Sequence, residues 1–436
     1  MRVWIAEATE WLPIDEGERP LRCGMLTAAL LARGHEVCWW SSTFHHARKI
    51  QRFNAPQTIA PRPGLTLRLL HGPGYRRNLS LGRMRHNRVI AQAFAREARA
   101  QPMPDVIFAC TPTPELAEQA VELGRRQACP VVIDVNDVWP DSYLRIVPRP
   151  IRPLTKLALI AEFRRMSRIC RMAHGLTAVS EAYLAWALKY AGRIGSARDR
   201  VFVLGFPTPP QEPANDVRER AVRVRSRFQI PTDAIVAAFV GIFGSTYDLE
   251  TVVRAARRLA SQRTNSAHIV LAGDGEKAAK LKAEARGLTN LTFAGWLDQD
   301  SLRDLLTISA IGLATYTSDA PQSMPYKPFE YMASGVALVS SLGGELGELV
   351  ESEKLGMSYR AGDAASLAGA IAQLCARPEA RQRMGANGRR IFAERFSDQV
   401  VYPALIEYLQ TIVNGARFAG DDPRRSERLV APPEPA

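Results

Sequence analysis

Short, continuously apolar runs alternate with helical stretches along most of the chain, and this alternation constrains the fold more than any other feature. In the first half the apolar runs are RVWIAEA, EVCWWSS, PDVIFAC and PVVIDVND. Stretches with helical spacing, such as TPELAEQAVELGRRQ, lie between them. Strands that are apolar on both faces and separated by helices indicate a parallel sheet covered on both sides. The predicted fold class is therefore α/β.

The same alternation begins again after a proline-rich stretch near residue 206, which predicts a second doubly wound domain. A length of 436 residues also exceeds what one compact core usually serves. We predict an N-terminal domain over residues 1–205 and a C-terminal domain over 206–396. A helix over 397–414 is expected to cross back to the N-terminal domain, followed by a disordered tail over 415–436. Because ligands bind at the carboxyl ends of strands in open α/β sheets, the site should lie between the two Rossmann-like domains.

The net charge of +13 resides entirely in the N-terminal half. Residues 1–205 hold 30 Lys and Arg against 17 Asp and Glu, whereas residues 206–436 hold 27 of each. Such a field attracts nucleic acid, anionic lipid headgroups or a phosphorylated substrate, and a plain solvated basic surface is the alternative. The sequence shows no helix-turn-helix, RNP or zinc signature that would favour nucleic acid, so we predict no nucleic-acid partner.

The segment SMPYKPFEYMASGVALVSSLGGELGEL, residues 323–349, combines features that packing alone does not require. A helix is predicted to begin near Lys327, and a helix N-terminus offers free N–H groups and partial positive charge to an anion. A lysine in the first turn opposes the helix dipole, which favours a bound anion nearby. Glu330 can accept two hydrogen bonds from vicinal hydroxyls such as those of ribose. An ordinary helix with solvated Lys327 and Glu330 is the alternative.

This segment resembles the nucleotide-sugar-binding segment of the retaining GT-B glycosyltransferases of family 4. That family has a glutamate, seven residues, a second glutamate, an Ala-x-Gly helix, an apolar strand and a Gly-Gly turn. The resemblance implies that Glu330 holds the donor ribose, and that the backbone of Ser323 and Met324 faces the diphosphate. Lys327 and Gln322 are predicted in catalytic roles. Gln322 replaces the first glutamate; it can hydrogen-bond the donor sugar but cannot stabilise a positive charge.

Further segments extend the resemblance over most of residues 1–413. RPLRCGMLTAALLARGHEVCWWSSTFHHARK and DVNDVWPDS are similar to the L-fucosamine transferase-like branch, which builds capsule, O-antigen or exopolysaccharide units on a lipid carrier. Asn136 stands where that branch has arginine. The segments FVGIFGSTYDLETVV, LAGDGEKAAKL and LTFAGWL match successive parts of the donor domain, although the first lacks the usual Arg and Lys. The resemblance implies donor contacts at Gly244, Gly273, Trp296 and Leu297.

Candidates for catalysis also occur in the N-terminal half. In the first loop, WLPIDEGERPLR, Gly17 is predicted to let the backbone approach the donor, with a plain turn glycine as the alternative. Asp137 follows a buried strand, where functional side chains gather, and is predicted as catalytic, with an N-cap as the alternative. Further acid–base candidates are Asp134, Glu16, His45 and His46. No residues have metal-ligand spacing, and the resemblance implies a metal-independent reaction with no cofactor.

The basic stretch RIVPRPIRPLTKLALIAEFRRMSRICRMAH suits a helix on an anionic membrane surface. Its apolar residues recur at helical spacing, with arginines interleaved: Leu154, Leu157, Ile160, Phe163, Met166 and Ile169. An ordinary core-facing helix with a basic solvent face is the alternative. No apolar run is long enough to span a bilayer, and no export signal is read. We therefore expect a cytoplasmic protein, peripheral on the inner face of the cytoplasmic membrane.

These observations predict a glycosyltransferase that moves a sugar from a nucleotide diphosphate sugar to an acceptor hydroxyl. We predict that the basic N-terminal domain, residues 1–205, binds the acceptor and that the C-terminal domain, residues 206–396, binds the nucleotide sugar. The resemblance implies retention of configuration and a lipid-linked glycan acceptor in cell-surface polysaccharide synthesis. A sugar-nucleotide 2-epimerase of the same fold is one alternative, since it shares the donor site. A basic nucleic-acid-binding protein is the other.

Overall fold

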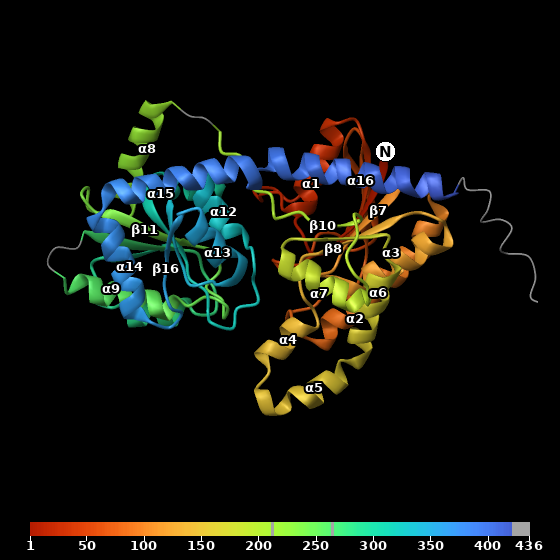
Figure 1. Ribbon diagram of the computed structural model, residues 1–436, viewed down its shortest axis with the longest axis horizontal. Coiled ribbons are helices and arrows are strands. Elements are labelled where there is room, and N and C mark those ends of the chain that lie inside the picture. Colours follow the sequence, from red (N-terminus) through yellow and green to blue (C-terminus); the bar gives the residue numbers. More distant parts are fainter. Residues whose placement is uncertain (211–212, 263–265, 421–436) are drawn as a thin grey trace, which may run out of the picture.

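The protein consists of two α/β domains that lie side by side (Figure 1). The structure is a computed structural model and describes residues 1–210, 213–262 and 266–420. One sheet belongs to each half of the chain, and the last helices pass from the C-terminal domain back along the N-terminal domain. Within the described residues, no helix is both long and apolar enough to cross a membrane.

The N-terminal domain is built on an eight-stranded sheet with the order β10-β9-β8-β7-β1-β2-β6-β5. Every neighbouring pair is parallel except β5 and β6. Its strands are β1 (Arg2–Ala6), β2 (Glu36–Ser42), β5 (Gln57–Arg62), β6 (Leu65–Leu70), β7 (Val106–Cys110), β8 (Val131–Val135), β9 (Gly175–Ala178) and β10 (Asp199–Val201), and β3 (Phe44–His45) pairs with β4 (Ile50–Gln51). Its helices are α1 (Arg22–Ala32), α2 (Leu81–Glu97), α3 (Pro114–Arg126), α4 (Asp141–Ile146), α5 (Arg152–Ala158), α6 (Ile160–Met172) and α7 (Glu181–Ala191), with 3₁₀ turns at Ala98–Ala100 and Arg149–Ile151.

The C-terminal domain has a parallel six-stranded sheet with the order β13-β12-β11-β14-β15-β16. Its strands are β11 (Ile235–Val240), β12 (Ala267–Ala272), β13 (Leu291–Gly295), β14 (Ser309–Ala314), β15 (Ala337–Ser340) and β16 (Gly356–Ser358). Its helices are α8 (Ala214–Arg227), α9 (Leu249–Ala260), α10 (Ala278–Glu284), α11 (Gln299–Ile308), α12 (Tyr326–Ala333), α13 (Gly344–Ser352), α14 (Ala364–Ala376) and α15 (Pro378–Ile391), and a π-helical turn spans Phe392–Phe396.

Each face of the N-terminal sheet has its own core, which explains why the strands are apolar on both sides. On one face Trp4, Trp40 and Phe94 meet edge to face, with ring centroids 5.1–6.4 Å apart. On the other face, Trp39 and Phe108 pack in a separate cluster. The α/β fold class with two Rossmann-like domains is confirmed.

The C-terminal helix α16 (Asp398–Gly420) returns to the N-terminal domain. Tyr402, Leu405 and Leu409 are buried in the same cluster as Trp39. The helix continues to Gly420. The prediction of a disordered tail is therefore wrong for residues 415–420, where the helix extends beyond its core residues. The rest of that predicted tail, residues 421–436, lies outside the described residues.

The basic stretch expected to form one amphipathic helix is instead divided into α4, α5 and α6, with breaks around Val147 and Leu159. Met166 and Ile169 on α6 are buried in the domain core. Leu154 and Leu157 on α5 are 69% and 65% exposed. Figure 1 shows α5 projecting from the domain. The stretch therefore combines a core-facing helix with an exposed apolar helix.

Candidate functional site

A cavity of about 340 Å³ lies between the two domains, and we call it the interdomain cavity. Asn136 and Val179 follow β8 and β9 of the first sheet, and Gly241 follows β11 of the second. The cavity thus opens at the carboxyl ends of strands from both sheets, where ligands of such folds bind. Its other lining residues are Arg19, Tyr183, Leu204, Val240, Tyr247, Tyr316, residues 322–327 and Glu330.

Five buried polar atoms of this lining have no hydrogen-bond partner within the described part of the chain. They are Arg19 Nη1, Asn136 Oδ1, Gln322 Oε1 and the hydroxyls of Tyr316 and Tyr326. Buried polar groups are almost always hydrogen-bonded in native proteins, because each unmade bond is costly. Such a concentration around one cavity indicates a polar ligand with several hydrogen-bonding groups.

The Arg19 guanidinium is held between two aromatic rings. Its carbon lies 4.4 Å from the ring centroid of Phe206 and 5.0 Å from that of Tyr326. These cation–π contacts fix the side chain while leaving Nη1 unpartnered. The sequence pattern pointed to Gly17 in the same loop and not to Arg19, because the partners of the arginine come from distant parts of the chain.

Lys327 is buried at the wall of the cavity. Its ammonium donates a hydrogen bond to the carbonyl of Val240 and lies 4.6 Å from the ring of Phe239 and 4.3 Å from that of Tyr247. Gly241 has φ +136°, and a Cβ there would lie 2.2 Å from Lys327 Nζ. The turn after β11 therefore needs glycine to admit the lysine.

Glu330 lies half-buried one helical turn beyond Lys327 and also lines the cavity. Burial raises the pKa of its carboxyl, whereas the positive charges of Arg19 and Lys327 lower it. The carboxylate is thus held beside two cations that come from different domains.

Ser323 and Met324 complete the cavity wall before α12. The Ser323 hydroxyl donates to Glu345 Oε1 at 3.0 Å, and Met324 is buried. Glu345 in turn accepts the backbone N–H groups of Glu181 and Ala182 at the start of α7, at 3.1 and 2.8 Å. The Gly-Gly turn segment therefore joins the two domains beside the cavity, a role that sequence analysis did not assign.

Five predicted site residues thus converge on the interdomain cavity: Gln322, Ser323, Met324, Lys327 and Glu330. The predicted donor contacts Gly17, Gly244, Gly273, Trp296 and Leu297 do not line it. Trp296 is 63% exposed, and Gly17, with φ +75°, stands in open space. A Cβ at Gly273 would meet the carbonyl of Gly241, so this glycine allows two loops to approach each other. The roles predicted for these five residues stay predictions.

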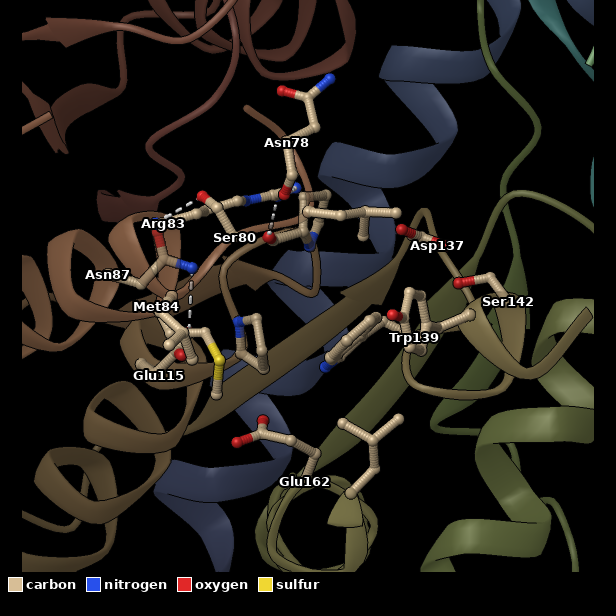
Figure 2. Close-up of a pocket in the computed structure, with 16 residues that line it drawn as sticks. Asn78, Ser80, Arg83, Met84, Asn87, Glu115, Asp137, Trp139, Ser142 and Glu162 are labelled. Atoms are coloured by element: carbon tan, nitrogen blue, oxygen red, sulfur yellow. Dashed lines mark hydrogen bonds between the residues drawn. The ribbon is translucent and has the colours of Figure 1, made fainter. Parts of the chain in front are cut away.

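Asp137 lines a second cavity of about 340 Å³, the N-domain cavity (Figure 2). Burial raises the pKa of Asp137, whereas hydrogen bonds from Val138 and Ser142 and the charge of Arg83 lower it. Because Asn136 lines the interdomain cavity, one short turn after β8 borders both cavities.

The other acid–base candidates lie elsewhere. Asp134 is buried in a bidentate ion pair with Arg22, at 2.6 and 2.9 Å, which assigns it to the core of the N-terminal domain. His45 packs against Trp11, and His46 is hydrogen-bonded to Tyr75. Burial and nearby positive charges lower the pKa of His46 to about 3. Neither these residues nor the exposed Glu16 line either cavity.

Comparison with known proteins relates this geometry to a class of enzymes. The family model described as "Glycosyl transferases group 1" matches residues 223–391, which include α12 and Glu330. A comparison with curated proteins gives no match.

Solved structures align with nearly the whole chain. Sucrose-phosphate synthase from Thermosynechococcus elongatus is 17% identical, with a TM-score of 0.73 over 95% of this chain and 99% of its own. The Anabaena protein HepE, in complex with UDP and glucose, is 15% identical, with a TM-score of 0.66 over 94% and 100%. WaaG, a glycosyltransferase involved in lipopolysaccharide biosynthesis, is 13% identical, with a TM-score of 0.64 over 94% and 99%.

The fold is therefore GT-B, with two Rossmann-like domains facing across a cleft. Together with the group 1 match in the C-terminal domain, the fold supports a glycosyltransferase.

Proposed function

We propose that the protein transfers a sugar from a nucleotide diphosphate sugar, bound in the interdomain cavity, to an acceptor hydroxyl. The observation that carries this proposal is the set of five unpartnered polar atoms around a cavity that Lys327 and Glu330 also line. A donor of this class offers hydroxyls, a base and two phosphates to such groups. The solved complex of HepE with UDP and glucose, which shares the fold, supports a donor of this kind.

The proposed roles follow from the charge of each group. Glu330 accepts hydrogen bonds from the ribose hydroxyls, and Gln322 bonds the hydroxyls of the donor sugar. Lys327 and Arg19 stabilise the negative charge that grows on the departing diphosphate. The N-terminus of α12, between Pro325 and Lys327, adds backbone N–H groups to the same charge.

In the proposed reaction, the bond from the anomeric carbon to the phosphate oxygen breaks as a bond to the acceptor oxygen forms. The acceptor proton passes to the departing phosphate oxygen. The resemblance to family 4 supports retention of configuration and a metal-independent reaction. The anomeric coupling constants of donor and product, measured by NMR, check retention; an inverted product would contradict it. Activity that EDTA abolishes and a divalent cation restores would contradict metal independence.

A lipid-linked glycan is the proposed acceptor, presented at the cytoplasmic face of the membrane in the synthesis of a cell-surface polysaccharide. The exposed Leu154 and Leu157 on α5 support this proposal, because apolar side chains among basic ones suit an anionic lipid surface. Arg149, Arg152 and Lys156 provide the neighbouring positive charge.

A thermal-shift panel of UDP, GDP, dTDP and their sugars tests the donor site. One nucleotide series should raise Tm selectively, because a ligand that binds only the folded state stabilises it. Glu330→Ala should weaken nucleotide affinity about 10- to 100-fold, since it removes hydrogen bonds to a charged group. Glu348→Ala, an exposed acid on α13, is the matched control. A folded Glu330→Ala protein with unchanged affinity would remove the ribose assignment.

Product analysis without an acceptor separates the transferase from the epimerase alternative. A transferase leaves the sugar of the donor unchanged, apart from slow hydrolysis. Conversion of the donor into its 2-epimer would contradict the proposed function, even if the nucleotide panel shows binding.

A further inference from the structure

The N-domain cavity contains chemistry that the donor site does not use. Figure 2 shows Asp137, Trp139 and Ser142 on one side of it, Arg83, Asn87 and Glu115 on the other, and Glu162 below. We propose that this cavity binds the terminal sugar of the acceptor, and that the sugar carries an apolar aglycone. The inference rests on the proposed function, whose acceptor it places in the structure.

Three carboxylates line this cavity, which is unusual for an apolar hollow in a strongly basic domain. Glu115 and Glu162 are buried, and each is fixed from behind. Arg165 forms ion pairs with both, and Asn87 donates to Glu115 Oε2 at 3.1 Å. Carboxylates only accept hydrogen bonds when ionised, so they match the donor hydroxyls of a sugar and oppose a phosphate or another anion.

The remaining walls are apolar and aromatic. Trp139 and Tyr143 lie with ring centroids 5.9 Å apart, and Met84, Pro112 and Leu159 extend the apolar surface. An apolar pocket with a few fixed polar groups is the usual form of a small-ligand site. A pyranose has this same division, with C–H groups on its faces and hydroxyls at its edge.

The rim of the cavity determines what the sugar is attached to. Leu79 and Leu81 line the rim and are 53% and 83% exposed. Such exposed leucines beside a cavity suit an apolar group that leaves the pocket along the surface. The exposed Arg76 and Arg77 lie next to them in sequence and suit an anionic linkage between sugar and lipid.

The reacting hydroxyl is placed by the turn that the two cavities share. Asn136 N–H donates to Thr111 Oγ1 at 3.2 Å, and Thr111 Oγ1 donates to the carbonyl of Asp137 at 3.4 Å, which fixes the turn. Burial raises the pKa of Tyr183, which lines the interdomain cavity, and the charge of Asp137 raises it further. Because this turn borders both cavities, Asp137 is placed to accept a hydrogen bond from the acceptor hydroxyl and to turn its oxygen toward the donor sugar.

The test uses the full-length protein and simple amphiphilic sugars as probes. Octyl glycosides of glucose, galactose, mannose and N-acetylglucosamine are titrated below their micelle concentrations and followed by calorimetry. Free sugars test the need for the aglycone, and octyl tetraethylene glycol tests the need for the sugar. At least one octyl glycoside should bind saturably and more tightly than both its free sugar and the glycol.

Two kinds of variant locate the binding. Asp137→Asn should weaken binding of that glycoside about 10- to 100-fold through a lost charged hydrogen bond. Trp139→Leu should weaken it as well, and serves where the first variant fails to fold. Leu79→Ser/Leu81→Ser should remove the advantage of the glycoside over the free sugar. Ile194→Ser, 94% exposed in the same domain, is the matched control and should change nothing.

The nucleotide panel is run on the same variants to separate the two hypotheses. The inference is supported if the variants bind the glycoside more weakly while nucleotides raise their Tm as much as in the natural protein. Equal binding of glycoside and glycol, no saturable binding by any glycoside, or insensitivity to both pocket variants overturns it. If no nucleotide shifts Tm but glycoside binding depends on Asp137, the sugar site stands and the donor proposal fails.

Discussion

At the scale of single residues, one glycine controls the position of Lys327, the lysine proposed to stabilise the departing diphosphate. Gly241→Ala would place Cβ 2.2 Å from Lys327 Nζ, at a φ of +136° that L-residues rarely adopt. The backbone strain alone costs about 1–3 kcal/mol, and the ammonium must move away from the cavity wall. We expect a lower Tm and a loss of nucleotide affinity.

Gly369→Ala, on α14 of the same domain, is the control for this variant, because its φ is ordinary and no atom lies within 4 Å of the new Cβ. It should keep both Tm and affinity close to those of the natural protein. Equal effects of the two substitutions would show that the turn tolerates a side chain at Gly241, and that Lys327 is not held as described.

One acid in the N-terminal domain makes stability depend on pH. Burial of its carboxyl and the charge of Glu7 raise the pKa of Glu10 to about 8, from an ordinary value of about 4.5, although the Cys23 N–H and the charge of Arg22 lower it. The folded protein keeps this proton while the unfolded chain releases it, so stability falls as pH rises from about 4.5 to 8. Glu10→Gln keeps an oxygen for the Cys23 N–H and removes the titration.

Urea denaturation measures the free energy of unfolding of both proteins. The difference in favour of Glu10→Gln should grow as pH rises from about 4.5 to 8 and should stay constant above pH 8. Glu36→Gln at an exposed position controls for the loss of an acid. A difference between Glu10→Gln and the natural protein that does not change with pH would contradict the assignment.

Residues of the site were predictable where neighbours in sequence are also neighbours in space. Lys327 and Glu330 lie on one helix, so their spacing alone indicated a shared function. Arg19, Asn136 and Tyr183 reach the same cavity from another domain, and no local pattern reports that approach. Asp137 was predicted from its place after a strand. It lines a different cavity from Lys327 and Glu330, and this separation depends on how the turn after β8 lies between the two cavities.

At the scale of secondary structure, α7 depends on the other domain for its N-terminal cap. The Ser180 side chain accepts from the Tyr183 N–H, whereas Glu345 accepts from Glu181 and Ala182. A carboxylate at a helix N-terminus stabilises it through both hydrogen bonds and the helix dipole. Glu345→Ala should cost about 1 kcal/mol or more of stability.

Hydrogen exchange gives a sharper measurement of this contact. The amides of Glu181 and Ala182 should exchange faster in Glu345→Ala and stay protected in Glu348→Ala, which changes an exposed acid on the same helix. Unchanged protection in Glu345→Ala would mean that the two domains do not hold this contact in solution.

Helices and strands were largely predictable, because their apolar periods are local. The basic stretch before residue 172 shows where such a pattern is insufficient. Leu154, Leu157, Met166 and Ile169 share one helical period, yet the first two are exposed and the last two are buried. The break around Leu159 separates them, and neither proline nor glycine marks that position in the sequence.

At the scale of the whole molecule, the two doubly wound domains followed from the repeated alternation of strands and helices, and the resemblance implied their GT-B arrangement. The extent of α16 did not follow from the sequence. Its contacts with the N-terminal core depend on residues almost the full chain length away, such as Trp39 and Leu409 in one cluster. The return of the last helix to the N-terminal domain was predicted, but only the folded chain shows which core residues it meets there.

The uneven charge of the molecule and its exposed leucines make one further prediction. All of the net charge of +13 belongs to residues 1–205, and α5 projects from this domain with Leu154 and Leu157 exposed. If both features face a membrane, binding requires anionic lipid for attraction and apolar side chains for insertion. The protein should bind phosphatidylglycerol vesicles more tightly than phosphatidylcholine vesicles, and rising salt should weaken that binding.

Leu154→Ser/Leu157→Ser separates insertion from simple charge attraction. It leaves every arginine in place but removes apolar surface that each leucine would bury, which should lower vesicle affinity about tenfold or more. Val222→Ser, an exposed apolar residue on α8 of the neutral domain, is the matched control and should bind like the natural protein. Co-sedimentation with vesicles measures all three proteins. If the leucine variant binds as tightly as the control, the basic surface attracts lipid without inserting, and α5 must serve another partner.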